Sequence, residues 1–186
     1  LDADDRYHRE FIARHRAFLS EHPDVDICGT YTCEIGADGQ TNDQSEVTAW
    51  FNHDLDLNEP ENWVWQNRLS HGSTMIRRSV YDHIGLASED LSVTLDWDFW
   101  VRALAAGHRF HVLPDVLFEW RVHGSNITYA GDAERVRCWS VTSGRTFHPY
   151  LDRIHRPDLK AQNLAGFLTH KEMANQPTAF VTSILG

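Results

Sequence analysis

Hydrophobic positions alternate with polar ones in some stretches of the chain, which predicts strands, and recur at helical spacing in others, which predicts helices. Residues 4–22 carry aromatic and aliphatic side chains at near-helical spacing, which predicts a helix that ends before Pro23. The alternating run DICGTYTCEI at 26–35 predicts a strand. The turn sequence GADG at 36–39 then predicts a hairpin whose second strand covers 46–51.

The middle of the chain is first polar and then clearly helical. A loop followed by a short helix is predicted over 52–69, and a short strand followed by a short helix over 72–85. The segment LDWDFWVRALAAG at 95–107 has the clearest helical pattern and ends in a glycine, as helices often do.

The last part of the chain returns to strands and then becomes helical again. Two β-like runs are predicted at 109–113 and 116–122, separated by a Pro-Asp pair and followed by the polar turn HGSN. From residue 131 onward the pattern is mostly helical.

Composition and charge narrow the class of protein. The 186 residues carry a formal net charge of −10, which argues against a nucleic-acid binder that works by neutralising phosphates. Seven tryptophans and 41% hydrophobic residues indicate a folded protein. Three unevenly spaced cysteines favour neither a disulfide framework nor a zinc knuckle, and no apolar run reaches the length of a membrane span. We therefore expect a cytoplasmic protein, with the inner face of the membrane as the alternative location.

Two groups of acidic residues are candidates for chemistry. Asp2, Asp4 and Asp5 crowd negative charge without a basic partner among them, which suggests either a divalent metal site or an acidic helix start. Asp96 and Asp98 begin the clearest helix, where carboxylates complement the helix dipole. Both a functional and a purely structural reading of each group are open at this point.

One of the twelve histidines stands apart from the others. His123 ends a predicted strand and enters a Gly-Ser-Asn turn, a position from which site residues are often presented. His8, His15 and His22 recur every seven residues, so neighbours lie roughly 10 Å apart on a helix and do not share a metal. These three are interpreted as a solvated stripe.

Four motifs occur in a fixed order along the chain. They are D-x-D at 2–4, H-x-S-x-M at 71–75, an acid and an aromatic before W-x-R-A-L-A-A-G at 96–107, and L-P-x-x-L-x-x-W-R-x-H-x-S-N at 113–126. In this order they resemble the glycosyltransferase family 2 enzymes, which have the GT-A fold. The resemblance implies an α/β fold, namely the C-terminal portion of a GT-A mixed sheet flanked by helices over 1–130. A helical extension over 131–186 would pack on the same domain.

The resemblance implies roles for the first acidic group and for the late histidine. Asp2 and Asp4 match the D-x-D motif, so Asp4 would ligate Mn²⁺ or Mg²⁺ while Asp2 faces the ribose side of a nucleoside-diphosphate sugar. Asp5 would support this site. His123 matches the histidine that approaches the same metal and diphosphate, with Asn126 as a lesser candidate nearby.

The resemblance also implies a general base and an acceptor side. Asp96 matches the acid that takes the proton from the acceptor hydroxyl. Trp97, Trp100 and His71 would line the acceptor side, since aromatic faces beside a carboxylate commonly hold a sugar ring. Leu95 stands where the family carries the first acid of a pair, a departure that removes an acid beside the base.

The predicted function is transfer of a single sugar to the hydroxyl of a glycan or another acceptor, in glycan or cell-surface polysaccharide biosynthesis. A single transfer is expected because the Q-x-x-R-W string of the family's processive synthases does not occur. The family's nucleotide-binding first half would precede Leu1. The sequence indicates neither the donor sugar nor the oligomeric state.

Two other functions remain open from the sequence. A catalytically silent domain that binds carbohydrate or protein would keep the scaffold, and Leu95 favours it. A metal-dependent hydrolase could use the same acids and would release free sugar or phosphate without an acceptor.

Overall fold

The computed structural model describes residues 2–42, 44–123, 126 and 132–169, and its contacts divide the chain into two compact units. Unit 1 comprises Leu1–Asn58, Arg68–Gly85 and His108–Asn126, and unit 2 comprises Glu59–Asn67, Leu86–Gly107 and Ile127–Gly186. The predicted helical extension over 131–186 thus shares its unit with two earlier segments, and its packing on the same domain as residues 1–130 stays a prediction.

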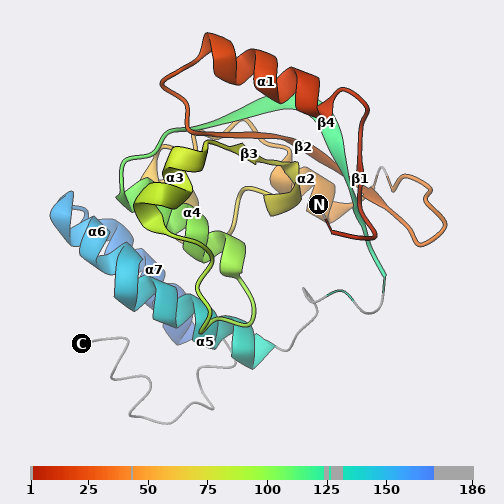
Figure 1. The fold of residues 1–186 in the computed structure, drawn as a ribbon. Helices are drawn as coiled ribbons and strands as arrows, with labels where there is room; N and C mark the ends of the chain where they lie inside the picture. The colour runs from red at the N-terminus through yellow and green to blue at the C-terminus, as the bar shows by residue number, and fades with distance from the viewer. Residues whose placement is uncertain (1, 43, 124–125, 127–131, 170–186) are drawn as a thin grey trace. The chain divides into compact units, whose positions relative to one another are not determined.

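Unit 1 is built on a four-stranded mixed sheet with the order β1-β4-β2-β3, which Figure 1 shows. The two long strands, β2 (Ile27–Ile35) and β4 (Phe110–Arg121), run parallel in its centre. The two short strands, β1 (Arg6–Tyr7) and β3 (Met75–Ile76), pair antiparallel at the edges. The predicted mixed α/β class is confirmed.

β4 is one continuous strand, so the prediction of two separate runs was wrong. Its ladder with β2 is interrupted, because Thr30 pairs with Leu113 whereas Tyr31 pairs with Val116. Pro114 has no backbone N–H to give to a ladder, and a bulge is the usual way to keep a proline inside a sheet. The Pro-Asp pair therefore distorts the strand without ending it.

α1 (Phe11–Glu21) lies across the sheet in Figure 1, and it begins later than predicted. Arg6 and Tyr7 pair with β4 and so cannot belong to the helix. Tyr7 also stacks on Phe11, with ring centroids 3.8 Å apart. Tertiary pairing thus overrides helical spacing over the first residues, and the acidic segment at 2–5 precedes a strand rather than a helix.

The predicted solvated stripe was wrong at its middle residue. His8 and His22 are exposed, but His15 is 0% exposed because Phe11 and Leu19 lie on the same buried face of α1. The Nδ1 atom of His15 lies 2.8 Å from the carbonyl oxygen of Phe11. Burial lowers the pKa of His15.

The segment predicted as the second strand of a hairpin is a helix, α2 (Glu46–Phe51). Ser45 caps it, since its hydroxyl accepts a hydrogen bond from the backbone N–H of Thr48. The GADG turn is present, but the returning chain forms only an isolated bridge between Ile35 and Thr41. The Ser45 cap therefore favours a helix at 46–51, where the alternating pattern predicted a strand.

The remaining elements of unit 1 follow the prediction. The short strand β3 leads directly into α3 (Arg78–Ile84), which ends at Gly85 with φ +78°. A single 3₁₀ turn, η2 (His71–Ser73), precedes β3.

Unit 2 is helical in the part of the chain that the structure describes. The helix predicted over 95–107 is confirmed as α4 (Leu95–Ala105), followed by Gly107 with φ +85°. The other helical segments are η1 (Pro60–Trp63), α5 (Asp132–Thr142), the π-helical η4 (Ser143–Phe147), α6 (His148–Arg153) and α7 (Pro157–Thr169). None of the helices in the described ranges is long and apolar enough to cross a lipid bilayer.

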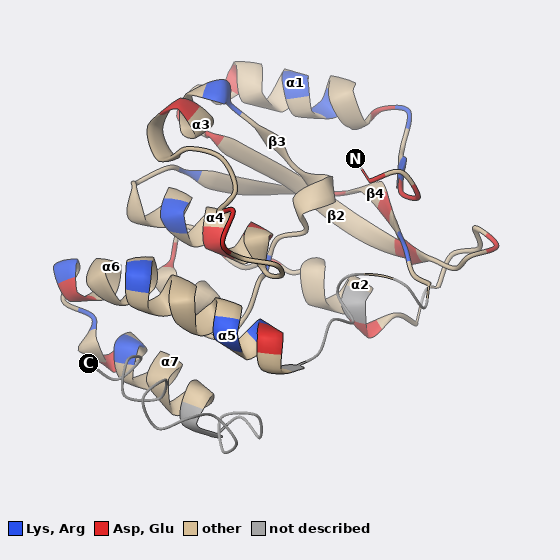
Figure 2. Ribbon diagram, turned by 60° about the horizontal axis from the view of Figure 1, so that its bottom comes forward, with Lys and Arg blue, Asp and Glu red and all other residues tan. Residues whose placement is uncertain are grey.

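A buried carboxylate holds unit 2 together. Asp98 is 0% exposed and accepts hydrogen bonds from Arg102 Nε at 2.9 Å, Ser88 Oγ at 2.7 Å and Thr142 Oγ1 at 3.0 Å. The guanidinium of Arg102 also donates to the carbonyl oxygen of Leu86. Figure 2 shows acidic and basic positions close together on α4. Asp98 thus ties α4 to α5 and to the segment before α4.

We expect Asp98→Ala to lower the free energy of unfolding by about 3–5 kcal/mol, because it leaves the largely buried Arg102 without its carboxylate. Urea unfolding followed by circular dichroism measures the change. Asp82→Ala is the matched control, since Asp82 forms an exposed i,i+4 pair with Arg78 and should cost less than about 0.5 kcal/mol. Equal costs for the two variants would contradict this account.

Stability should fall as the pH drops from about 7.5 to 5.5. Burial lowers the pKa of His15, His53, His111 and His148 below the ordinary histidine value of about 6.5. As the pH falls below that value, these histidines bind more protons in the unfolded chain than in the folded chain, so the free energy of unfolding decreases. Urea midpoints across this range measure the slope, and His15→Leu should flatten it. A midpoint that rises toward pH 5.5 would contradict the prediction.

Candidate active site

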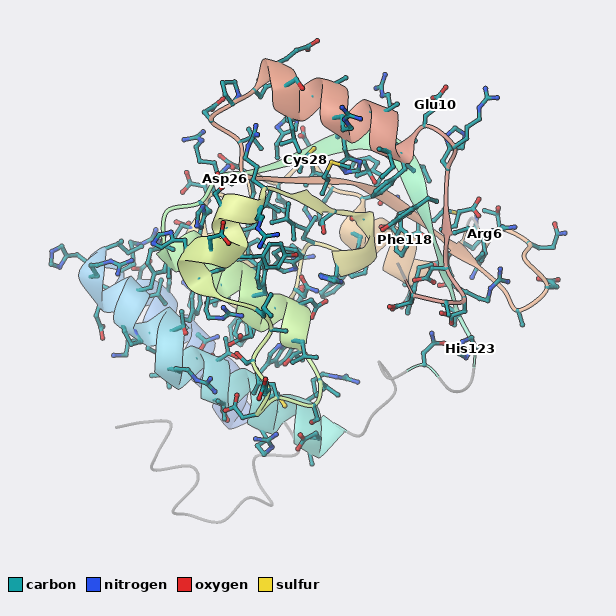
Figure 3. All side chains as sticks on the ribbon, viewed as in Figure 1. Arg6, Glu10, Asp26, Cys28, Phe118 and His123 are labelled. Carbon is teal, nitrogen blue, oxygen red and sulfur yellow. The ribbon has the colours of Figure 1, made fainter. Side chains whose placement is uncertain are left out.

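The pairing of β1 with β4 brings the start of the chain beside the end of β4. Arg6 lies opposite Glu119, so the residues before β1 run next to those that follow Arg121. The Nε2 atom of His123 lies 2.6 Å from Oδ2 of Asp4, and Figure 3 labels His123 just beyond the end of β4. Two residues that are 119 positions apart in the sequence thus form one polar pair.

The Asp4–His123 pair is accessible and suited to a cation. The two side chains are 38% and 31% exposed. The hydrogen bond from His123 is the main cause that lowers the pKa of the Asp4 carboxyl, so this group is ionised at neutral pH.

Arg121 holds the acidic segment in place, a role that the sequence did not indicate. Its backbone N–H donates to Oδ1 of Asp5 at 2.8 Å, and its Nε–H donates to the carbonyl oxygen of Asp4 at 2.7 Å. The same guanidinium donates to the carbonyl oxygen of Gly36 at 2.8 Å, which joins the segment to the GADG turn. Burial is the main cause that raises the pKa of Asp5. Asp5 therefore acts here as an anchor for the backbone.

Asn126 closes the turn that carries His123. Its Oδ1 atom accepts from the backbone N–H of His123 at 2.6 Å, and its Nδ2 atom donates to the carbonyl oxygen of Arg121 at 3.0 Å. The two contacts fix the backbone from Arg121 to His123. Asn126 thus positions His123, whereas Asp2 is exposed and its place beside a nucleotide stays a prediction.

The Asp4–His123 pair could supply two ligands to a divalent cation. A carboxylate oxygen and an imidazole nitrogen converge at Asp4 and His123. No group of three or more His, Cys, Asp or Glu side chains arranged for a metal occurs in the described residues. A cation at this pair would take its remaining ligands from water and from phosphate oxygens, as Mg²⁺ and Mn²⁺ commonly do.

Asp96 belongs to unit 2 and has a partner that the sequence did not reveal. It lies in the first turn of α4, and its Oδ2 atom accepts from Nδ2 of Asn67 at 2.5 Å. Its Oδ1 atom accepts from the backbone N–H of Trp97 at 2.8 Å. Asn67 thus orients the carboxylate of Asp96. In the sequence, only the Asn-rich composition of 52–69 could have indicated that Asn67 has such a role.

The predicted acceptor residues are divided between the two units. His71 is exposed in unit 1. Trp97 and Trp100 are 1% and 0% exposed in unit 2, where Trp97 packs edge-on against Trp139 and lines a cavity of about 90 Å³. Both indole rings belong to the core, and their role toward an acceptor stays a prediction that this burial does not favour.

The structure therefore assembles the predicted residues in two sets. Asp4, Asp5 and His123 meet at the end of β4 in unit 1, and Asp96 stands with Asn67 in unit 2. Asp98, which the sequence grouped with Asp96, is a buried structural residue.

Solved structures of Staphylococcus aureus TarS have a similar fold. The crystal structure of TarS 1–349 in complex with UDP-GlcNAc matches with a TM-score of 0.60 at 17% identity, covering 99% of this chain and 56% of that one. The crystal structure of TarS 1–349 matches with a TM-score of 0.58 at 16% identity, covering 92% and 46%. A longer TarS structure gives 0.57 at 16% identity, covering 94% and 29%.

These matches establish the fold. The chain spans a little over half of TarS 1–349 in the first comparison. No protein-family model and no curated protein matches the sequence. The chain has the mixed α/β GT-A fold of part of TarS, as the order of its motifs implied.

Proposed function

We propose that this chain forms part of a metal-dependent, inverting glycosyltransferase that moves one sugar from a nucleoside-diphosphate sugar to a hydroxyl acceptor. The observation that carries the proposal is the Asp4–His123 pair at 2.6 Å, formed at the end of a central strand. The fold shared with a protein solved in complex with UDP-GlcNAc supports a donor of the uridine-diphosphate class. A glycan is the proposed acceptor class.

Asp4 and His123 would hold the cation, Mn²⁺ or Mg²⁺, through one carboxylate oxygen and one imidazole nitrogen. When bound, such an ion neutralises the negative charge that develops on the leaving diphosphate. Arg121 keeps the acidic segment at a fixed place, so the two ligands stay paired before any substrate arrives. Preorganisation of this kind lowers the cost of binding.

Asp96 would act as the general base. Its carboxylate takes the proton from the acceptor hydroxyl while the hydroxyl oxygen forms a bond to the anomeric carbon. The bond from that carbon to the diphosphate oxygen breaks on the opposite face, and the diphosphate leaves with the electron pair. Asn67 orients the carboxylate through the 2.5 Å hydrogen bond.

A catalytically silent binding domain is the second candidate function. Leu95 favours it, because this residue is 36% exposed beside Asp96 and offers no acid to support a base. The two candidates differ in the consequence of removing the Asp96 carboxylate.

The first test measures nucleotide binding and transfer in the full-length protein. Calorimetry with UDP, dTDP and GDP should give Mn²⁺-dependent binding of one nucleotide, and Asp4→Asn should remove that dependence. Asp96→Asn should leave nucleotide binding unchanged and slow sugar transfer about 10²- to 10⁴-fold. Asp82→Asn on the surface of α3 is the control and should change neither quantity.

Either of two results would overturn the proposal. One is that none of the nucleotides binds more tightly with Mn²⁺ or Mg²⁺ than without. The other is that metal-dependent binding occurs but Asp96→Asn has no effect on transfer. Metal-dependent binding without any transfer would instead support the silent domain.

The role of Asn67 gives a separate prediction. Asn67→Ala should lower kcat about tenfold, which corresponds to one hydrogen bond of about 1.4 kcal/mol, and should leave UDP binding unchanged. In the Asp96→Asn background the same substitution should cause almost no further loss, because its partner has already been altered. Equal losses in both backgrounds would show that Asn67 acts independently of Asp96.

A further inference from the structure

Two histidines and an aspartate meet at the amino end of the central strands β2 and β4. The Nδ1 atom of His83 lies 3.0 Å from Nε2 of His108. The other ring nitrogen of His108, Nδ1, lies 3.2 Å from Oδ2 of Asp26. All three residues belong to unit 1, and Figure 3 labels Asp26 next to the start of β2.

The parallel pairing of β2 and β4 creates this cluster. Ile27 lies opposite Phe110, so Asp26, just before β2, lies beside Arg109 and close to His108, the two residues that precede β4. The backbone N–H of Arg109 donates to Oδ2 of Asp26 at 3.1 Å and fixes the carboxylate. His83 comes from the last turn of α3.

The backbone around Asp26 is equally constrained. Its N–H donates to the carbonyl oxygen of Arg109 at 2.9 Å, and its carbonyl oxygen accepts from the N–H of Arg77 at 2.9 Å. These contacts fix the backbone of Asp26, and the hydrogen bond from the Arg109 N–H holds its carboxylate beside His108.

We infer that His83 and His108 form a binding site for a borderline divalent transition metal ion such as Zn²⁺, with Asp26 orienting His108. Metal–nitrogen bonds of about 2.0–2.1 Å place two cis nitrogen ligands about 2.8–3.4 Å apart, depending on coordination geometry. The observed separation of 3.0 Å lies within that interval. Imidazole nitrogens bind Zn²⁺, Cu²⁺ or Ni²⁺ in preference to Mg²⁺. A metal-bound histidine usually donates its other ring N–H to a carboxylate, and Asp26 takes that place beside His108.

The exposure of the cluster suits reversible loading. The His108 side chain is 12% exposed and is held by Asp26, which is 25% exposed, while His83 lies at the surface. His108 is therefore already held in position, and His83 is accessible to an incoming ion. Water would complete the coordination.

Proton balance allows the ion to replace a hydrogen bond. In neutral His83 and His108 a single proton lies between Nδ1 and Nε2. When a metal binds these two nitrogens, His83 carries its proton on Nε2 instead, toward solvent. His83 changes its tautomer, and no net proton is released at neutral pH.

The site is distinct from the Asp4–His123 pair. That pair lies beyond Arg121, whereas His108 lies before Phe110, so the whole of β4 separates them. Twelve residues at about 3.3 Å each span roughly 35–40 Å. The inference therefore stands independently of the proposed glycosyl transfer.

The test is calorimetry of Zn²⁺ binding to the chain. We expect one site that is lost in His83→Gln and in His108→Gln. Asp26→Asn should weaken it about 10- to 100-fold, the range that loss of an outer carboxylate usually produces. The melting temperature should rise with Zn²⁺ in the wild type, because the ion links α3 to the sheet, and should not rise in His83→Gln.

Two controls separate this site from other histidines. His123→Gln removes the pair at the far end of β4, and His155→Asn removes an exposed histidine in unit 2. Both should retain the Zn²⁺ site. Loss of Zn²⁺ binding in His123→Gln alone, or undiminished binding in both His83→Gln and His108→Gln, would overturn the inference. Circular dichroism of each variant confirms that it is folded.

Discussion

The parallel pairing of β2 with β4 is the interaction on which unit 1 depends. A parallel ladder aligns both strand starts at one edge and both strand ends at the other. The first edge carries Asp26 and His108, and the second carries Arg121, which holds the segment that precedes β1. Because polar side chains cluster where strands begin and end, a single pairing defines two separate chemical environments.

The sequence predicted the elements that are governed by local pattern and missed those decided by distant partners. Strong periodicity identified β2, α4 and the short β3–α3 unit. The segment at 46–51 alternates like a strand, but the Ser45 cap makes it helical. The start of α1 and the continuity of β4 both depend on strand pairing across about a hundred residues. No window of local sequence contains that information.

The pairing of Asp4 with His123 was predicted because the order of the motifs along the chain identifies the two residues together. Asp4 and His123 were expected to share a site, and the structure pairs them directly. The residues that hold such groups were not visible, since Arg121 and Asn67 act through hydrogen bonds over 117 and 29 positions. Nor did the sequence show that Asp98 is structural, because that role depends on its burial and on the distant partners that donate to it.

The bulge in β4 has a consequence for how unit 1 opens. The ladder with β2 is regular on one side of Pro114 and again after Thr32 has paired with Phe118, with register shifts in between. Cooperative opening propagates along unbroken ladders, so an interruption separates two stretches of backbone. The stretch near Phe110 and the stretch near Arg121 can therefore exchange their amide hydrogens with solvent at different rates. One end of the sheet can open while the other keeps its hydrogen bonds.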